Sequence, residues 1–137
     1  MKDDCLFCKI AKGDIPSATI YEDRYFRVFL DVNPASKGHC LIVPREHFDN
    51  IYDLDGETAG RLFALATGVA RALRKALSCD GLNLVQNNGK AAGQTVNHFH
   101  LHLIPRYEGD QLGLLWEPKH LKEEEMEELR KKIKNAI

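Results

Sequence analysis

The chain has 137 residues, of which 44% are hydrophobic and 28% are charged, with a formal net charge of -1. This length suits a single globular domain over residues 1–137, and the near neutrality offers no basic field to nucleic acid. The N-terminal sequence MKDDCLFCKI lacks the apolar core of a signal peptide, and no run is long enough to cross a membrane. We therefore expect a cytoplasmic protein that binds neither nucleic acid nor membrane.

The first half of the chain predicts three strands and a long helix. Apolar runs at residues 18–23 and 25–32 flank a polar stretch, and the run at 38–44 ends at a proline. Residues 55–78 have the helical period, with Asp55 as N-cap and Gly81 beyond the end. The apolar stripe of this helix comprises Ala59, Leu62, Phe63, Ala66, Val69, Ala70, Leu73 and Leu77.

The second half predicts a strand at 82–87, a loop, a strand at 96–105 and a helical tail at about 119–137. Acidic residues begin the tail and lysines end it, which suits the helix dipole. Its charged residues indicate a solvated face, and docking to a partner is the alternative. Successive strands with one long helix and a C-terminal helix predict an α+β fold with an antiparallel sheet.

The segment VNHFHLHLIP, residues 96–105, carries three of the six histidines. Side chains of a strand alternate between two faces, so His98, His100 and His102 share one face. Phe99, Leu101 and Leu103 then face a core. A strand whose polar face happens to be histidine is the simpler interpretation. The strict alternation instead favours histidine's usual roles as ligand, base and nucleophile.

Cys5 and Cys8 form a CxxC pair near the N-terminus. Zinc would need two further ligands, and unpaired buried thiols are the main alternative. A redox pair comes third, because no strand precedes the motif. The remaining cysteines, Cys40 and Cys79, are expected to be packing residues. Histidines that could complete a zinc site are His39, His47, His98, His100, His102 and His120.

The loop NNGKAAGQT, residues 87–95, leads directly into the histidine segment. Its small residues would let backbone N–H groups approach an anion, although a flexible connection explains them equally well. No Walker lysine motif is present. Asp31 ends a strand, where it is either a turn former or an acceptor for a sugar diol.

His98 to Ile104 read His-Phe-His-Leu-His-Leu-Ile, which resembles the motif of the histidine triad (HIT) family. GQTVN before it, FLDVNPASKGHCLIVPREH and CLFCKIAKGDIPSATIYED resemble other segments of that family, so the resemblance runs from about Cys5 to Tyr107. The branch it resembles is that of the small bacterial nucleotide-binding hydrolases. The "IPRY" after the triad differs from the Gly-Gly ending of the phosphoramidase branch, which leaves the leaving group open.

The resemblance implies cleavage at the α-phosphate of purine nucleoside phosphoramidates or (di)nucleoside polyphosphates. His100 would be the nucleophile that forms a nucleotidyl-histidine, and His102, Gln94 and Thr95 would contact the phosphate. His98 would complete the triad. A nucleotide-binding regulator with weak residual hydrolysis is the alternative, and a metalloenzyme with all three histidines on one zinc is a third.

The resemblance also implies the rest of the site. Asp31 would bind the ribose and Asn87 the phosphate, with His39 nearby. A homodimer would join two sheets across a two-fold axis. A structural Zn²⁺ would lie on Cys5, Cys8, His47 and His98. The base pocket would be lined by Phe7, Ile10, Ile15, Phe29, Val32 and Leu41.

Overall fold

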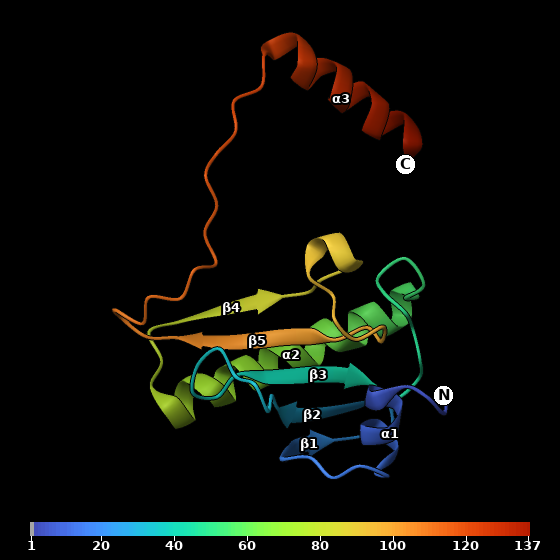
Figure 1. The fold of residues 1–137 in the computed structure, drawn as a ribbon, viewed down its shortest axis with the longest axis vertical. Helices are drawn as coiled ribbons and strands as arrows, with labels where there is room; N and C mark the ends of the chain where they lie inside the picture. The colour runs from blue at the N-terminus through green and yellow to red at the C-terminus, as the bar shows by residue number, and fades with distance from the viewer. Residues whose placement is uncertain (1) are drawn as a thin grey trace.

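The structure is a computed structural model that describes residues 2–137, and within them the chain forms three α-helices, a short 3-10 helix and five strands (Figure 1). The strands make one antiparallel sheet in the order β1-β2-β3-β5-β4. The predicted α+β class is confirmed. The helices are α1 (Leu6–Lys12), α2 (Gly56–Leu77) and α3 (Glu123–Ala136), and the 3-10 helix is η1 (Lys90–Ala92). The strands are β1 (Thr19–Glu22), β2 (Phe26–Leu30), β3 (Cys40–Pro44), β4 (Gly81–Val85) and β5 (Leu101–Arg106).

The long helix α2 covers one face of the sheet (Figure 1) and supplies four of the twelve buried residues of the main core. Leu62, Ala66, Val69 and Leu73 are buried, so the predicted stripe is narrower than expected. Phe63 and Leu77 lie at its margins and are 56% and 37% exposed. The core cluster under α2 comprises Phe26, Val28, Cys40, Ile42, Phe48, Leu62, Ala66, Val69, Leu73, Phe99, Leu101 and Leu103.

The short helix α1 packs against the opposite face of the sheet, where Phe7 and Ile10 join Phe29, Leu41 and Val43 in a second cluster. Neighbours in β2 and β3 divide between the two clusters, as the alternation of strand side chains requires. The apolar pattern does not predict α1, because a helix of seven residues is too short to show a period. Cys5 caps its start by accepting the backbone N–H of Cys8, and Gly13 ends it at φ 92°.

Two arginines, one in β2 and one directly after β3, hold the far end of α1. Arg27 of β2 donates to the carbonyl of Ile10 at 2.8 Å, and Arg45 donates to the carbonyl of Ala11 at 2.8 Å. The last carbonyls of a helix lack a partner in a following turn, and Arg45 satisfies that of Ala11, while the Ile10 carbonyl accepts both Arg27 and the N–H of Gly13. α1 is thereby fixed to β2 and to the residue after β3.

The histidine strand is shorter than predicted, because β5 begins at Leu101. Pairing with β3 ends where Ile42 lies opposite Leu101. Beyond this point the carbonyl of Pro44 accepts from the His98 ring, and the N–H of Phe99 donates to Phe48. The alternation itself holds, since Phe99, Leu101 and Leu103 all belong to the core under α2. The strand predicted at 82–87 is likewise shorter and ends at Val85.

The C-terminal segment leaves the sheet after β5, and α3 stands apart from the rest of the molecule (Figure 1). The tail predicted as helical from about residue 119 becomes helical at Glu123 and contains no buried residue. Among the helices within residues 2–137, none combines the length and the apolar character needed to cross a membrane.

Candidate active site and metal centre

Two cysteines and two histidines converge where α1 meets the sheet. Their ligand atoms all lie within 4.8 Å of one another, and the group could hold a metal ion. The Sγ of Cys8 lies 3.4 Å from the Nδ1 of His47 and 3.5 Å from that of His98. The Sγ of Cys5 lies 3.4 Å from the Nδ1 of His98. A tetrahedral zinc with bonds of about 2.3 Å to sulfur and 2.0 Å to nitrogen separates its S and N ligands by roughly 3.5 Å. The spacing of this group therefore fits zinc.

The second nitrogen of each histidine in this group has its own partner. The Nε2–H of His98 donates to the carbonyl of Pro44 at 2.8 Å. His47 Nε2 lies 2.6 Å from the carboxylate of Asp49. These partners place the ring proton on Nε2 and leave each Nδ1 lone pair turned toward the sulfurs, as in histidines that bind metals. Burial lowers the pKa of His98 to about 4, which keeps the ring neutral and able to act as a ligand.

A cavity of about 410 Å³ opens on the α1 face of the sheet, beside this group. One end is apolar, with Phe7 of α1 and Phe29 of β2 in edge-to-face contact at 5.8 Å between ring centroids. The other end carries titratable side chains. The cavity is lined by Leu6, Phe7, Ile10, Pro16, Ser17, Phe29, Leu30, Asp31, Val32, Asn33, His39, Leu41, Thr95, Val96, His100 and His102.

His100 presents one free nitrogen to this cavity. Its Nδ1 lies 2.7 Å from the carbonyl of His98, which can only accept, so Nδ1 carries the proton and Nε2 the lone pair. Burial lowers the pKa of His100, against the opposing effects of this hydrogen bond and of Asp31. The ring is 6% exposed and meets the edge of Phe7 at a centroid distance of 4.9 Å. A neutral imidazole with an available lone pair has the chemistry of a nucleophile.

His102 presents a donor rather than a lone pair, because a chain of hydrogen bonds fixes its tautomer. The backbone N–H of Ala35 donates to His39 Nδ1 at 2.8 Å, so the proton of His39 is on Nε2. That Nε2–H donates to His102 Nδ1 at 2.9 Å. The remaining proton of His102 is therefore on Nε2, and burial first, then His100 and His39, lower its pKa to about 4. His102 thus stays neutral and keeps one N–H available as a donor.

Asp31, His39 and His102 also lie close enough together to hold a metal ion, with ligand atoms within 4.8 Å of one another. The hydrogen bond from Ala35 opposes this, because it places a proton on the His39 nitrogen that would bind the metal. Among residues 2–137, the metal-compatible groups separate His98 from His102 and leave His100 out of both. The geometry therefore does not favour one zinc on all three triad histidines.

Asp31 is a turn former, and its side chain also lines the cavity. Its Oδ1 accepts the backbone N–H of Asn33 at 2.8 Å, which makes it a turn former. Its Oδ2 lies 3.5 Å from His39 Nε2, and the side chain is 18% exposed at the cavity. One oxygen shapes the turn, and the other lies on the side of His39.

Not every predicted site residue reaches the cavity. Gln94 is committed to the backbone: its Oε1 accepts from Gly89, and its Nε2 donates to the carbonyls of Asp49 and Val96. Ile15 does not line the cavity and packs against the second cluster, which α1 forms with β2 and β3. Asn87 lies in the half-buried segment after β4 and is not among the lining residues. Thr95 does line the cavity, as do Phe7, Ile10, Phe29, Val32 and Leu41.

Some participants carry no side-chain signal in the sequence. Ala35 and Pro44 act through a backbone amide and a backbone carbonyl, which every sequence position could supply. Asp49 could have been found as an acidic residue two positions after His47. Cys40 is fully buried in the core, where burial raises its thiol pKa to about 12, so it is an inert packing residue as expected.

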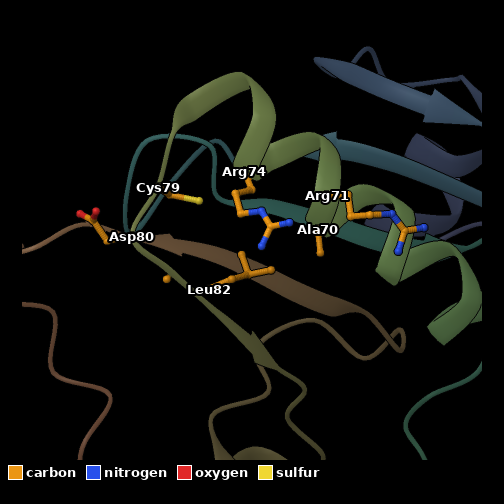
Figure 2. A pocket seen from close by; sticks show the side chains of 7 residues that line it. Ala70, Arg71, Arg74, Cys79, Asp80 and Leu82 are labelled. Atoms are coloured by element: carbon orange, nitrogen blue, oxygen red, sulfur yellow. The ribbon is translucent and has the colours of Figure 1, made fainter.

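A second concave surface lies between the end of α2 and the start of β4 (Figure 2). It measures about 260 Å³, and the side chains of Arg71 and Arg74 extend along it above Leu82. Cys79 lies at its rim and is half-buried, so it is less enclosed than a packing residue. Apart from this lone thiol and Asp80, the groove carries no nucleophile or base, so the candidate chemistry belongs to the triad cavity.

The family model of the HIT domain matches residues 12–109. The Bacillus subtilis protein hit is 46% identical over 83% of this chain and 79% of its own length. Adenosine 5′-monophosphoramidase of Schizosaccharomyces pombe is 37% identical over 97% of this chain and 98% of its own. Adenylylsulfatase of Arabidopsis thaliana is 39% identical over 82% of this chain and 57% of its own.

Solved structures agree with these relatives. A Streptococcus mutans protein superposes with a TM-score of 0.95 at 42% identity, over 99% of this chain and 87% of that one. A HIT family protein of Bacillus anthracis gives 0.92 at 38%, over 100% and 99%. A zinc-bound histidine triad family protein of Mycobacterium smegmatis gives 0.77 at 40%, over 98% of both chains. From the triad, the fold and these matches together, the chain belongs to the HIT family.

Proposed function

We propose that this protein is a nucleotide hydrolase or transferase that cleaves at the α-phosphate of purine nucleoside phosphoramidates or (di)nucleoside polyphosphates. The observation that carries the proposal is His100, a buried neutral imidazole with its Nδ1–H tied to the His98 carbonyl and its Nε2 free at the cavity. Relatives named adenosine 5′-monophosphoramidase and adenylylsulfatase support nucleotide chemistry of this kind.

The first step is attack of His100 Nε2 on the α-phosphorus. A P–N bond forms, and the bond from phosphorus to the leaving group breaks with its electron pair on that group, which takes a proton from solvent. The positive charge on the nucleotidyl-imidazole is stabilised by the Nδ1–H bond to the His98 carbonyl. His102 donates its Nε2–H to a phosphoryl oxygen, where negative charge grows. Water then attacks phosphorus: a P–O bond forms, the P–N bond breaks with its electron pair returning to His100 Nε2, and the proton of the water passes to solvent, so the nucleotide leaves with His100 restored.

The rest of the cavity supports binding of a nucleotide. The free oxygen of Asp31 accepts ribose hydroxyls, and the apolar end between Phe7 and Phe29 takes the base. The volume of about 410 Å³ lies in the range of small-ligand sites. Because the Gln94 amide is committed to backbone groups, we assign it to holding the loop before the triad rather than to the phosphate. Asn87 is assigned to the phosphate through its place in the same loop.

We propose that the metal is a structural Zn²⁺ on Cys5, Cys8, His47 and His98. Four protein ligands close a tetrahedral site, so the metal has no open position for a substrate. When bound, it would supply a cross-link between α1 and the histidine segment. The zinc-bound relative supports a metal in this family.

We further propose a cytoplasmic homodimer of single HIT domains spanning residues 1–137, with no nucleic-acid or membrane partner. β4 is an edge strand of the sheet, and Leu84 on it is 42% exposed. A free edge of this kind favours pairing with the same edge of a second copy.

A turnover panel tests the proposed function. Nucleoside phosphoramidates and dinucleoside polyphosphates of adenine and guanine are offered to the wild-type protein, and quenched samples are analysed by mass spectrometry. We expect multiple turnovers and a nucleotidyl adduct on the peptide that contains His100. Binding without turnover or adduct would instead make the protein a nucleotide-binding regulator.

A further inference from the structure

A loop at the edge of the triad cavity determines the tautomers of two histidines inside it. We call residues 32–38, between β2 and β3, the β2–β3 loop. Ala35 of this loop donates its backbone N–H to His39 Nδ1 at 2.8 Å, and His39 Nε2 lies 2.9 Å from His102 Nδ1. Residues 32–35 are exposed, so packing around the amide does not fix its place. The N–H that His102 offers to the cavity therefore depends on what holds this loop.

The side chain of Ser36 binds the loop to the strand that carries His102. Its hydroxyl donates to the carbonyl of Pro105 at 2.6 Å. Pro105 lies in β5 with His102 and is fully buried, so this acceptor belongs to a rigid part of the sheet. In Figure 1 the β2–β3 loop accordingly lies beside the end of β5. Because Ser36 directly follows Ala35, fixing the serine also restricts the Ala35 amide.

The backbone of Ser36 also closes the loop. Its carbonyl accepts the N–H of His39 at 3.2 Å, in a turn whose third residue is Gly38 at φ 91°. This is the position at which such a turn favours glycine. A Cβ on Gly38 would overlap a methyl group of Leu77, so the turn lies directly on the end of α2. Ser36 thus joins the loop to β5 through its side chain and to β3 through its carbonyl.

Tyr107 supplies a second hydroxyl to the same loop. It donates to the carbonyl of Lys37 at 2.9 Å, in a bond that is exposed to solvent. The Ser36 bond is partly buried and is adjacent to the amide that matters. We therefore expect Ser36 to contribute more than Tyr107 to the position of Ala35.

The tautomers would change if the amide of Ala35 left His39. The proton of His39 would then be free to lie on Nδ1, and its Nε2 would accept a hydrogen bond from His102 Nδ1. In that arrangement His102 Nε2 carries a lone pair in place of its proton. Two lone pairs, those of His100 and His102, would face the oxygens of a bound phosphate, and the donor would be lost.

We propose that Ser36 is a positioning residue for His102. Its hydroxyl holds the β2–β3 loop so that the Ala35 amide stays on His39 Nδ1. The catalytic importance of this contact rests on the proposed function, in which His102 donates to the phosphate. Asp31 Oδ2 lies 3.5 Å from His39 Nε2 and also favours a proton there. Loss of the hydroxyl should therefore produce a mixture of tautomers and not a complete reversal.

Nitrogen NMR of the His102 ring tests the inference without a substrate. The full-length wild type, Ser36→Ala and Ser36→Thr are compared at neutral pH. We expect the Nε2–H tautomer in the wild type, a mixture in Ser36→Ala, and the Nε2–H tautomer again in Ser36→Thr, which keeps a hydroxyl. A pure Nε2–H tautomer in Ser36→Ala would overturn the proposal.

Thr67→Val is the matched control. It removes a hydroxyl that donates to the carbonyl of Ala64 at 2.8 Å on the exposed side of α2. We expect this variant to show the tautomer and the turnover of the wild type. If it changed both as much as Ser36→Ala does, the effect would be general destabilisation and the positioning role would be wrong.

Turnover gives a second readout that separates positioning from binding. We expect Ser36→Ala to lower kcat about tenfold, as for partners that orient a functional histidine, and Ser36→Thr to recover most of it. KM should stay within about threefold, because the ribose contact is held separately. The N–H of Asp31 donates to the carbonyl of His39 at 3.0 Å, and Asp31 Oδ1 accepts from Asn33. A rise in KM with unchanged kcat would contradict the proposal.

Two outcomes are kept apart by this design. If the wild type turns over no nucleotide, the proposed function fails, and the tautomers still decide whether Ser36 positions His102. If Ser36→Ala does not fold, Tyr107→Phe removes the other hydroxyl from the same loop. We expect a smaller part of the same tautomer shift in Tyr107→Phe, and an unchanged ring in that case would overturn the proposal.

Discussion

His98 and His100 lie two residues apart on one face of one segment, yet they belong to different sites. His98 faces two sulfurs in a group of four residues that could hold a metal ion, and His100 faces an open cavity. The difference lies in the second nitrogen of each ring. His98 uses Nε2 on the carbonyl of Pro44, and His100 uses Nδ1 on the carbonyl of His98. The alternation of side chains brings both rings to one face of the segment. The backbone carbonyl that each ring binds then determines which ring nitrogen keeps its lone pair available.

The largest effect that would separate the two sites is expected from His100→Ala. Loss of the nucleophile should lower kcat by about 10³-fold or more, because the covalent route is gone. Nucleotide affinity should stay within about tenfold, because base and ribose contacts are elsewhere in the cavity. Zinc per chain, measured by elemental analysis, should equal that of the wild type. A loss of metal in this variant would place the ion at the triad's centre and contradict the division.

Cys5→Ser/Cys8→Ser is expected to lose the metal and to keep more of the activity than His100→Ala does. This variant should lose its zinc and melt about 5–10 °C lower, because the link between α1 and the histidine segment is gone. Activity should fall less than in His100→Ala. Cys79→Ser removes a half-buried thiol outside the group and serves as the control. Equal zinc content in the two variants would leave Cys5 and Cys8 as ordinary buried thiols.

The proton chain through His39 can be tested apart from the metal. His39→Ala removes the donor that fixes His102, and we expect kcat to fall about 10–100-fold, as for other partners that orient a functional histidine. His39→Gln keeps an N–H donor and should recover part of the loss. Nitrogen NMR of the His102 ring should show the Nε2–H tautomer in wild type and a mixture in His39→Ala. An unchanged tautomer in that variant would remove His39 from the positioning role.

Asp31→Ala should weaken ribonucleotide binding by about 1–3 kcal/mol, the range for a hydrogen bond to a charged group. Because the second oxygen of Asp31 is proposed to hold the ribose, the loss should be smaller for the 2′-deoxynucleotide. Calorimetry with both sugars measures the difference. Equal losses would leave Asp31 as a turn former for Asn33 only.

The smallest effect concerns acid stability. The pKa of His102 is about 4 in the folded chain against an ordinary 6.5, so the folded state binds its proton more weakly than the unfolded state. The neutral ring's contribution is fully present above about pH 6.5 and is lost as the pH falls toward 4. Denaturant unfolding at pH 5 and 7.5 should show a smaller loss for His102→Gln than for wild type. Equal pH dependence would mean that the ring is less enclosed than the hydrogen bonds imply.

The sequence predicted those parts of the molecule that repeat a pattern. The period of residues 55–78 located α2 within one residue at each end, and the alternation after Asn97 sorted the core side chains from the histidines. The triad motif and the CxxC pair pointed to two sites. The sequence did not predict α1, which is too short for a period.

Contacts that join distant backbone groups to side chains were also beyond sequence reasoning. The carbonyl of Pro44 meets a ring 54 positions away, and the amide of Ala35 sets the tautomers of His39 and His102. Gln94 was expected at the phosphate because a polar side chain before the triad suits that role. In the structure its amide instead forms hydrogen bonds with three backbone groups.

α1 is anchored at its two ends by unrelated chemistry. Cys5 and Cys8 place its first turn beside His47 and His98 in the group that could hold a metal, while Arg27 and Arg45 bind the carbonyls of its last turn independently of any ion. Removal of the metal would free the N-terminal end of α1 and leave its C-terminal end attached. The helix would then rotate about the end that the arginines hold, and it would not detach. Phe7 belongs to α1 and contacts the ring of His100. If zinc binds this group as proposed, its removal would change the shape of the triad cavity before it caused global unfolding.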